Sequence, residues 1–245
     1  MKTPWSDPIS MSYHKKQWET PKQSTIEFEK FLAEKISVTQ NVIDVGCGTG
    51  ASTNYIASRN RECTFVGLDQ DATLIQVAAE TLNKASDGNN LRFEVGDCFD
   101  LSSIGKSAFD GVLSLQTLSW LESWEEPMKQ IYLNLEPNWI GLSSLFYPGD
   151  ISAEIRIFEP VRERVTNYNV ISIKGLNRHA NDYGYEVKKF EKFEISIDLP
   201  KPENEDVMGT YTLRTELSDG NSRLQLSGPI IMPWYFVLIE KIHTN

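Results

Sequence analysis

Residues 42–53, Val-Ile-Asp-Val-Gly-Cys-Gly-Thr-Gly-Ala-Ser-Thr, decide the fold class of this 245-residue chain. An apolar strand runs here into a turn with three glycines, and the turn opens a helix. Gly46, Gly48 and Gly50 carry no side chain that would keep a ligand off the backbone, and glycine adopts φ values that other residues avoid. A nucleotide-like ligand is therefore expected to lie against bare main chain at this turn.

The acid at the end of this strand helps to distinguish two kinds of ligand. The glycine spacing, taken with Ala51, also satisfies the dinucleotide-binding fingerprint, so the turn alone leaves the nucleotide open. Asp44 stands two residues before the first glycine, where it would repel a pyrophosphate and attract a ligand that carries an ammonium and a sulfonium group. The arrangement resembles the first motif of the class I S-adenosylmethionine-dependent methyltransferases, acid-x-Gly-x-Gly-x-Gly.

Two further motifs follow in the order that this resemblance requires. Residues 64–69 form a short apolar strand that ends in Asp69, about 20 residues past the glycines, the spacing at which a carboxylate can accept both ribose hydroxyls. Residues 91–98 form a third strand, after which the resemblance implies that Asp97 accepts from the adenine amino group and that the Cys98 N–H donates to the ring. A fourth strand, residues 111–115, ends at Gln116.

The cofactor implied by the resemblance is S-adenosylmethionine, and the resemblance covers residues 27–147 well and the rest loosely. The residues expected to bind it are Asp44, Gly46, Cys47, Gly48, Asp69, Gln70, Asp97, Cys98 and Gln116. Each motif has a structural alternative, because strand–glycine–helix turns are common in α/β proteins, Asp69 fits a solvated strand end and Asp97 fits a helix cap. Their order on consecutive strands favours the joint interpretation.

Length and composition predict one main domain without a membrane span. A chain of this length with 40% hydrophobic residues can bury one large core, with room for a small appendage. The longest apolar run, residues 230–239, is too short to cross a bilayer and contains Pro233, and residues 1–8 lack the apolar stretch of a signal peptide. We therefore expect a soluble cytoplasmic protein with no membrane partner.

Charge and cysteine content exclude several functional classes. A net charge of -10 and a pI near 4.9 argue against a surface that neutralises many phosphates, so nucleic acid is not an expected partner. Cys47, Cys63 and Cys98 form no Cys-x-x-Cys pair, which gives no sign of a disulfide framework or a zinc site. No metal site is predicted.

The remaining pattern alternates strands with helices, which predicts a Rossmann-like, doubly wound, mostly parallel seven-stranded sheet. Capping boxes at residues 24–27 and 123–126 are expected to start two helices, and residues 71–85 form another. Residues 139–147 are the fifth strand. Farther on, the pattern suggests a strand at 153–158, a helix at 172–183 and strands at 187–199, 210–217, 223–226 and 234–242, with a hairpin turn at 218–221.

The resemblance implies that the strands at 187–199 and 234–242 form an antiparallel hairpin at the C-terminal edge of the sheet. Residues 200–229 between them would be a small β insertion, entered through the polar, proline-containing linker 200–206. We expect residues 1–22 to form an N-terminal lid segment and residues 23–245 the methyltransferase domain.

Methyl transfer needs the acceptor aligned with a carbon already activated by positive sulfur, and it needs a general base only if the acceptor arrives protonated. The candidate catalytic side chains are His179, Asp150 and His14, although solvent-exposed histidines and a turn acid are the commoner explanation of such residues. The candidate acceptor-pocket residues are Tyr13, Trp18, Trp120 and Tyr147, for which packing on the sheet is the alternative.

Missing motifs narrow the expected acceptor. Residues 116–120, Gln-Thr-Leu-Ser-Trp, replace the Asp/Asn-Pro-Pro-aromatic run of amino-group DNA methyltransferases, and no Pro-Cys nucleophile or paired-glutamate loop is present. The expected function is methyl transfer to oxygen or nitrogen of a small molecule. The alternatives are a protein, carrier-bound or glycan acceptor docked on residues 200–229, a non-catalytic cofactor-binding regulator, and a nicotinamide-dependent reductase.

Overall fold

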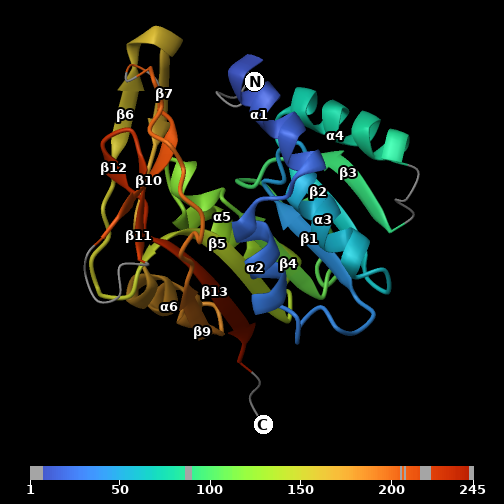
Figure 1. Ribbon diagram of the computed structural model, residues 1–245. Helices are drawn as coiled ribbons and strands as arrows, with labels where there is room; N and C mark the ends of the chain where they lie inside the picture. Colours follow the sequence, from blue (N-terminus) through green and yellow to red (C-terminus); the bar gives the residue numbers. More distant parts are fainter. Residues whose placement is uncertain (1–7, 86–89, 205, 207, 216–221, 243–245) are drawn as a thin grey trace.

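The computed structural model describes residues 8–85, 90–204, 206, 208–215 and 222–242. Its central sheet has the strand order β3-β2-β1-β4-β5-β13-β9, with the short strand β8 paired to β5 outside this path (Figure 1). The strands of the sheet are β1 (Asn41–Val45), β2 (Thr64–Asp69), β3 (Leu91–Val95), β4 (Gly111–Leu115), β5 (Trp139–Tyr147), β8 (Ile171–Ser172), β9 (Tyr185–Lys192) and β13 (Trp234–Lys241).

The first five strands are parallel, and β13 runs antiparallel to both β5 and β9. The expected doubly wound sheet with an antiparallel C-terminal edge pair is therefore confirmed. The order in which strands are added reverses between β1 and β4. From β1 the chain adds β2 and β3 toward one edge, and from β4 it adds β5 toward the other. In such sheets ligands bind beyond the carboxyl ends of the strands near the reversal point, and that end of β1 carries the glycine turn.

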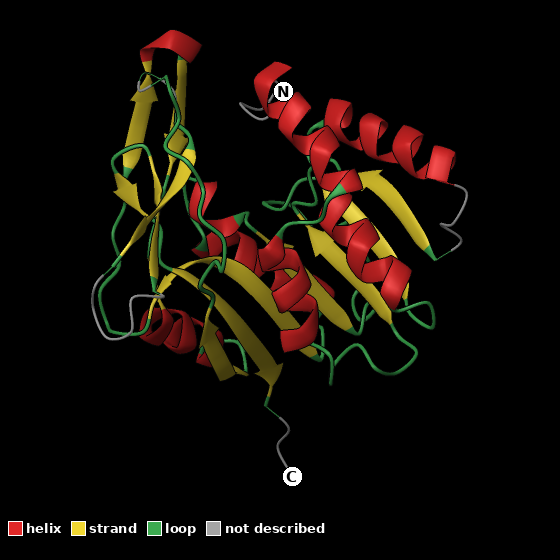
Figure 2. Cartoon of the chain, viewed as in Figure 1, coloured by secondary structure: helices red, strands yellow, loops and turns green. Residues whose placement is uncertain are grey.

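Helices cover both faces of the sheet, as Figure 2 shows. One face carries α2 (Gln23–Phe31), α3 (Ala51–Arg59) and α4 (Ala72–Ala85), and the other carries α5 (Glu125–Gln130), the helical turn η3 (Ile131–Leu135) and α6 (Ile173–Asn181). Because successive strand side chains point to opposite faces, Val42 belongs to the core that α2 and α3 cover, while Ile43 belongs to the core that η3 and α6 cover. Two apolar cores result, one on each face.

Antiparallel strands outside the central sheet form a separate β module. A three-stranded sheet contains β10 (Thr210–Arg214), β11 (Arg223–Ser227) and β12 (Ile230–Ile231), and a hairpin contains β6 (Arg156–Glu159) and β7 (Arg164–Asn167). In Figure 1 both lie to the left of the sheet, across from α1 (Pro8–Glu19). The predicted strand pair 210–217 and 223–226 is present, although its turn at 218–221 and the residues 216–217 lie outside the described residues.

Two of the predicted strands need correction. The strand expected at 187–199 is β9 and ends at Lys192, because β13 begins at Trp234 after Pro233 and offers no partner beyond Phe193, whose N–H bonds to Trp234. The strand expected at 153–158 is β6, shifted because Ala153 pairs only in an isolated bridge with Val170.

The two predicted capping boxes differ in outcome. Helix α2 begins at Gln23 with Lys22 as its N-cap, so the box at 24–27 is wrong, and the Ser24 hydroxyl accepts instead from the Gln116 amide at 3.1 Å. At the second box the Ser123 hydroxyl accepts from the Glu126 N–H at 3.4 Å as expected, but the Glu126 carboxylate turns to Lys129 and Gln130. Helix α5 then passes into the wider turn η3.

No helix in the described ranges combines the length and the apolar character that a bilayer span requires.

Candidate cofactor and acceptor site

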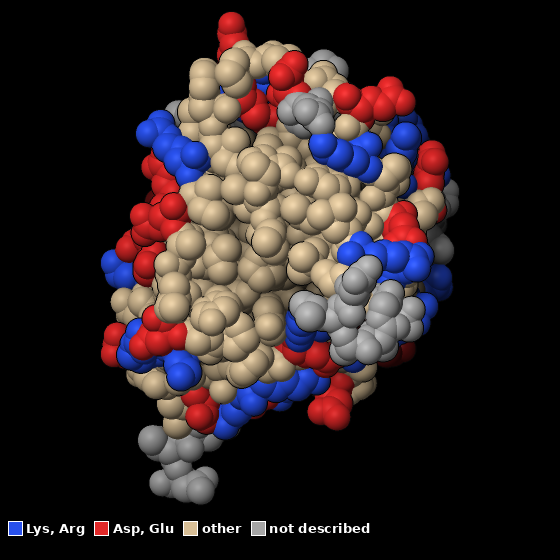
Figure 3. Space-filling view, turned by 60° about the vertical axis from the view of Figure 1, so that its left-hand side comes forward, with Lys and Arg blue, Asp and Glu red and all other residues tan. Residues whose placement is uncertain are grey.

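A cavity of about 760 Å³ lies beyond the carboxyl ends of the central strands. The glycine turn and the ends of β2 and β4 form one side, α1 covers a second side, and the β module closes the third. Figure 3 shows a broad hollow of uncharged residues with lysine, arginine and acidic side chains around it. The cavity therefore joins the predicted cofactor motifs to an apolar compartment made by the β module.

The glycine turn presents open backbone to this cavity. Gly46 has φ +84°, and a Cβ there would lie 2.4 Å from Thr117, so the turn is packed tightly against the end of β4. Gly48 has φ +57°, and a Cβ there would meet no atom within 4 Å. A ligand can thus reach the main chain at Gly48, as the sequence predicts for a nucleotide-like cofactor.

Asp69 holds the glycine turn from the neighbouring strand. Its Oδ2 accepts the Gly48 N–H at 2.8 Å and its Oδ1 accepts the Asp71 N–H at 2.9 Å. Burial raises the pKa of Asp69, while the two backbone hydrogen bonds oppose that rise. Each carboxylate oxygen has a second lone pair, so the side chain can still accept two hydroxyl donors from a ligand in the cavity.

Asp44 is the most enclosed acid of the site. Its side chain is 1% exposed, Oδ2 accepts from the Thr53 hydroxyl at 2.5 Å, and Oδ1 is buried with no hydrogen-bond partner among the described residues. Burial raises the pKa of Asp44 to about 7, opposed by the Thr53 hydrogen bond and reinforced by the nearby charge of Asp69. An unpaired carboxylate oxygen on a cavity wall fits a cationic ligand group, so S-adenosylmethionine suits this site.

The third motif, residues 91–98, lies only partly on the cavity wall. Gly96 and Cys98 line the cavity, whereas Asp97 is not among the lining residues and accepts the Phe99 N–H at 2.9 Å in a turn. Burial raises the pKa of Cys98 to about 12 and raises that of Cys47 as well, so both thiols are neutral. Gln70 also lines the cavity, beside Asp69.

Gln116 ties the start of α2 to the end of β4. It has φ +57°, its Oε1 accepts from the Lys22 ammonium at 2.6 Å, and its amide donates to Ser24 at 3.1 Å. Trp120, in the turn η2 (Leu118–Trp120), stacks on Trp234 with ring centroids 5.6 Å apart. These contacts make an aromatic wall between the cofactor motifs and the β module.

Helix α1 lies over the glycine turn. Tyr13, His14 and Gln17 line the cavity, while Trp18 is absent from the lining and instead donates its indole N–H to the Thr49 carbonyl at 2.9 Å. The Trp18 ring also contacts Phe93 edge-on at 6.5 Å. Trp18 therefore attaches this segment to the glycine turn, and it does not line the cavity where the sequence predicts it.

We expect Trp18→Phe to weaken binding of S-adenosylhomocysteine by about 0.5–1 kcal/mol, because it removes one hydrogen bond that holds α1 on the glycine turn. Isothermal titration calorimetry of the variant and its parent measures this difference. Tyr147→Phe, at an exposed aromatic outside the cavity lining, is the matched control and is expected to bind as the parent does. Unchanged affinity in Trp18→Phe would show that the contact does not support the turn.

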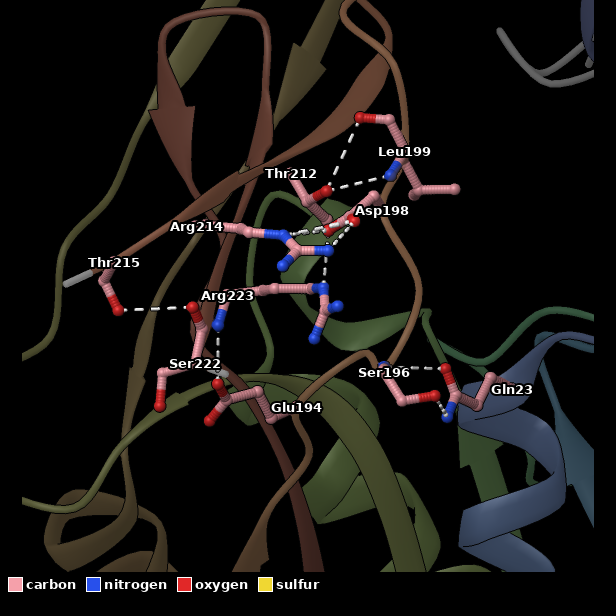
Figure 4. Close-up of polar contacts among 10 residues, drawn as sticks. All are labelled: Gln23, Glu194, Ser196, Asp198, Leu199, Thr212, Arg214, Thr215, Ser222 and Arg223. Carbon is pink, nitrogen blue, oxygen red and sulfur yellow. Dashed lines mark hydrogen bonds and ion pairs between the residues drawn. The ribbon is translucent and has the colours of Figure 1, made fainter. Parts of the chain in front are cut away.

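The acceptor side of the cavity is bounded by residues 193–199, which we call the strap. Alternate side chains of this extended segment face the cavity, and they are all apolar: Phe193, Ile195, Ile197 and Leu199. The residues between them make polar contacts on the other side (Figure 4). Glu194 accepts the Arg223 N–H at 2.7 Å, and Asp198 pairs with the side chains of Arg214 and Arg223.

Ser196 connects the strap to the core domain. Its hydroxyl accepts from the Gln23 amide at 2.6 Å, and its N–H donates to the Gln23 Oε1 at 3.0 Å (Figure 4). The strap thus lies between α2 and the sheet of β10 and β11, held on both sides by hydrogen bonds. Its position sets the width of the acceptor compartment.

We expect Gln23→Ala to raise amide hydrogen exchange in the strap about fivefold, because it removes both bonds to Ser196 at a cost of about 1 kcal/mol. Mass spectrometry of peptides covering 193–199 measures this change. Lys30→Ala is the matched control on the same helix, since its ion pair with Glu27 is exposed. Equal exchange in both variants would show that α2 does not hold the strap.

Three predicted site residues lie away from the cavity. His179 packs on α6 among Trp124, Tyr132 and Tyr183, with ring centroids 5.2–5.8 Å away, and burial lowers its pKa. The structure therefore corrects the expectation that the helix at 172–183 reaches the pocket rim.

Asp150 and Tyr147 are likewise outside the cavity lining. The Asp150 side chain is about half exposed and forms a two-point ion pair with Arg178 at 2.6 and 2.9 Å, which lowers the pKa of its carboxyl. Tyr147 is 45% exposed at the end of β5. Neither is placed to hold an acceptor in this cavity.

Sequence reasoning missed most of the acceptor compartment. The strap, Tyr168, Arg162 and Met208 line it, although they are far apart in the chain and belong to no motif. The apolar and polar residues at 193–199 alternate, and the same alternation is typical of a β-strand, so the sequence predicts that the strand continues there.

Comparison with known proteins identifies the family. A family model described as a methyltransferase domain matches residues 36–194. The chain is 26% identical over 204 residues to a trans-aconitate 2-methyltransferase of Deinococcus radiodurans, a match that covers 81% of this chain and 66% of that protein. It is 31% identical to a sterol 24-C-methyltransferase of Debaryomyces hansenii over 49% of this chain and 32% of that protein.

The chain thus spans less than two thirds of the length of these curated relatives. Among solved structures, a SAM-dependent methyltransferase from Methanosarcina mazei superposes with a TM-score of 0.58 at 14% identity, covering 84% of this chain and 94% of that one. This likeness shows a shared fold. Together with the family match over residues 36–194, it establishes that the chain belongs to the methyltransferase domain family and has the fold of the class I S-adenosylmethionine-dependent methyltransferases.

Proposed function

We propose that this enzyme methylates an oxygen or nitrogen atom of a small-molecule acceptor. The observation that carries the proposal is the cavity, which extends from the glycine turn to a compartment enclosed by the strap, the aromatic wall and the β module. A chamber covered on these sides suits a compact molecule better than a protein segment. The names of the two curated relatives, which specify trans-aconitate and a sterol, also favour a small acceptor.

The proposed cofactor contacts are those that the resemblance implies for the ends of the strands. Asp69 would accept the ribose hydroxyls, Asp44 would pair with the ammonium of the methionine part, and Gly46, Cys47 and Gly48 would supply open backbone. Gly96 and Cys98 would lie beside the adenine, and Asp97 would accept from its amino group. Gln70 and Gln116 complete the contact set.

Bound S-adenosylmethionine supplies a methyl group that is activated by positive sulfur. The protein then has to place a lone pair of the acceptor in line with that carbon and exclude water. The Tyr168 and Ser227 hydroxyls lie 3.2 Å apart on the cavity wall and can hold an oxygen or nitrogen of the acceptor by hydrogen bonds. His14 is the candidate base that lines the cavity.

We propose residues 1–22 as a lid and residues 200–229 as an insertion that shapes the acceptor compartment. The described part of the first segment, α1, rests on the glycine turn through Trp18. The second segment contributes Met208, Gly209, Thr210, Gln225 and Ser227 to the cavity wall. Both segments thereby govern which molecules reach the cofactor.

Incubation of the enzyme with cell extract and methyl-labelled S-adenosylmethionine, followed by mass spectrometry, tests the proposed acceptor class. Label in a low-molecular-mass product, with the methyl on oxygen or nitrogen, is the expected result. Label only in protein or on a carbon atom would overturn the proposal. The matched control is the same incubation with the Asp69→Ala variant.

A further inference from the structure

A buried arginine on the β module stands out because its hydrogen-bonding capacity is not used. Arg162 ends the short helical turn η4 (Pro160–Arg162) between β6 and β7, and its side chain is 12% exposed. Its Nε is buried and has no hydrogen-bond partner among the described residues. Because an enclosed, unpaired guanidinium donor is costly, this arrangement calls for an acceptor group.

The acidic neighbour of Arg162 is already engaged elsewhere. Glu159 is 3% exposed, and its carboxylate accepts the Met208 N–H at 2.9 Å and a hydrogen bond from the Arg164 Nε. The nearest contact from Arg162 to Glu159 joins Nη1 to Oε1 at 3.8 Å, which is beyond hydrogen-bond distance. Arg162 and Glu159 attract each other electrostatically, but the guanidinium N–H groups of Arg162 remain available to a ligand.

Arg162 lines the same cavity as the aromatic wall and the strap. Trp120 stacks on Trp234 with ring centroids 5.6 Å apart and meets Tyr168 at a tilt with centroids 5.7 Å apart, and Phe193 and Ile195 face the cavity from the strap. Two other cationic side chains line the cavity, but Arg164 donates to Glu159 and Lys22 donates to Gln116. A ligand held here therefore meets apolar and aromatic surface over its body and the guanidinium of Arg162 at one end. The hollow in Figure 3 is correspondingly uncharged over most of its area.

We propose that Arg162 binds a carboxylate of the methyl acceptor, so that the acceptor is an acid with an apolar or aromatic body. The planar guanidinium donates two parallel hydrogen bonds to a carboxylate and gives orientation as well as affinity. This inference rests on the proposed function, because it specifies the chemistry of the small molecule that enters the cavity. Arg162 is a specificity residue in this scheme and takes no part in the transfer step.

Calorimetry with paired probes tests the inference without turnover. Arylacetates and aliphatic monocarboxylates of increasing size, including naphthalene-2-acetate, are titrated beside their amides into enzyme saturated with S-adenosylhomocysteine. We expect at least one acid to bind the parent tenfold more tightly than its amide. Arg162→Gln should remove that preference while leaving affinity for the amide unchanged, and Arg162→Lys should retain part of it.

Arg178→Gln is the matched control, because Arg178 is exposed and paired with Asp150 outside the cavity. A parent enzyme that prefers no acid in the panel, or an Arg162→Gln variant that keeps the preference, would overturn the inference. If Arg162→Gln does not fold, Arg162→Lys decides the matter, because it keeps the charge but should retain only part of the acid-over-amide ratio of the parent. Methylation of neutral small molecules alone would leave the proposed function standing, whereas selective acid binding without any small-molecule product would count against the proposed function only.

Discussion

Asp69→Ala is expected to weaken binding of S-adenosylmethionine by about 2–3 kcal/mol, or roughly 30- to 150-fold. The carboxylate accepts the Gly48 and Asp71 N–H groups at 2.8 and 2.9 Å, so its loss releases the glycine turn. It also removes the two acceptors proposed for the ribose hydroxyls. Both effects act on the cofactor, and neither involves the acceptor compartment.

Titration calorimetry with S-adenosylhomocysteine measures this loss directly. Asp100→Ala is a suitable control, because Asp100 accepts the Ser102 N–H in an exposed turn and is absent from the cavity lining. Its affinity for the cofactor product should match that of the parent. An Asp69→Ala variant that binds as tightly as its parent would show that the ribose assignment is wrong.

The second large effect concerns the pH dependence of Asp44. Burial raises its pKa to about 7 from 3.8, so the carboxyl is protonated below neutrality and cannot pair with a cation until it loses that proton. Affinity for S-adenosylmethionine should therefore fall up to tenfold for each pH unit below about 7. Above that pH, Asp44 should add no further change. Asp44→Asn should bind weakly and should lack this dependence.

The stability of the cofactor-free protein should change in the opposite sense. Between pH 3.8 and about 7 the unfolded chain ionises Asp44 while the folded chain keeps the proton, so the contribution of this residue to stability falls as the pH rises. The rise in pKa corresponds to about 4 kcal/mol against folding above pH 7, as an upper figure. Asp44→Asn should accordingly be more stable than the parent at pH 8 by about 2–4 kcal/mol.

Denaturant unfolding at pH 5 and pH 8 and calorimetry at pH 5.5, 6.5 and 7.5 check the two halves of this prediction. The stability difference between Asp44→Asn and the parent should be roughly one third as large at pH 5 as at pH 8. Equal differences at both values, or a parent affinity that does not change with pH, would show that Asp44 is ionised throughout. Asp110→Asn is the control, because Asp110 accepts the Asn41 N–H at an exposed site on the same sheet.

Local patterns were sufficient for the cofactor half of the molecule. The stretch from Val42 to Thr53 predicted the strand, the turn and the helix, and the acids that end β1 and β2 were placed on the cavity wall by chain order alone. Parallel strands joined by crossover helices bring their carboxyl ends to one edge. The sequence therefore predicts that residues at the ends of consecutive strands lie close together, and this prediction needs no knowledge of side-chain packing.

The acceptor half could not be derived in this way, because it depends on contacts between segments distant in sequence. His179 had the residue type and the helix of a catalytic base, but α6 packs on β8 and β9 and places it among aromatic rings. The sequence of the strap is typical of a strand. It leaves the sheet because β13 begins at Trp234 and offers no strand partner beyond that residue.

The sequence by itself thus determined the sheet, the glycine turn and the positions of Asp44 and Asp69 on the cavity wall, since each follows from periodicity and spacing within a few tens of residues. Tertiary structure alone decided that the strap, Trp120 and Arg162 enclose one compartment, with Gln23 joined to Ser196 across 173 positions. Such contacts depend on how the layers of the fold pack together. Contacts between segments that are far apart in the sequence produce no periodic pattern of residues from which they could be predicted.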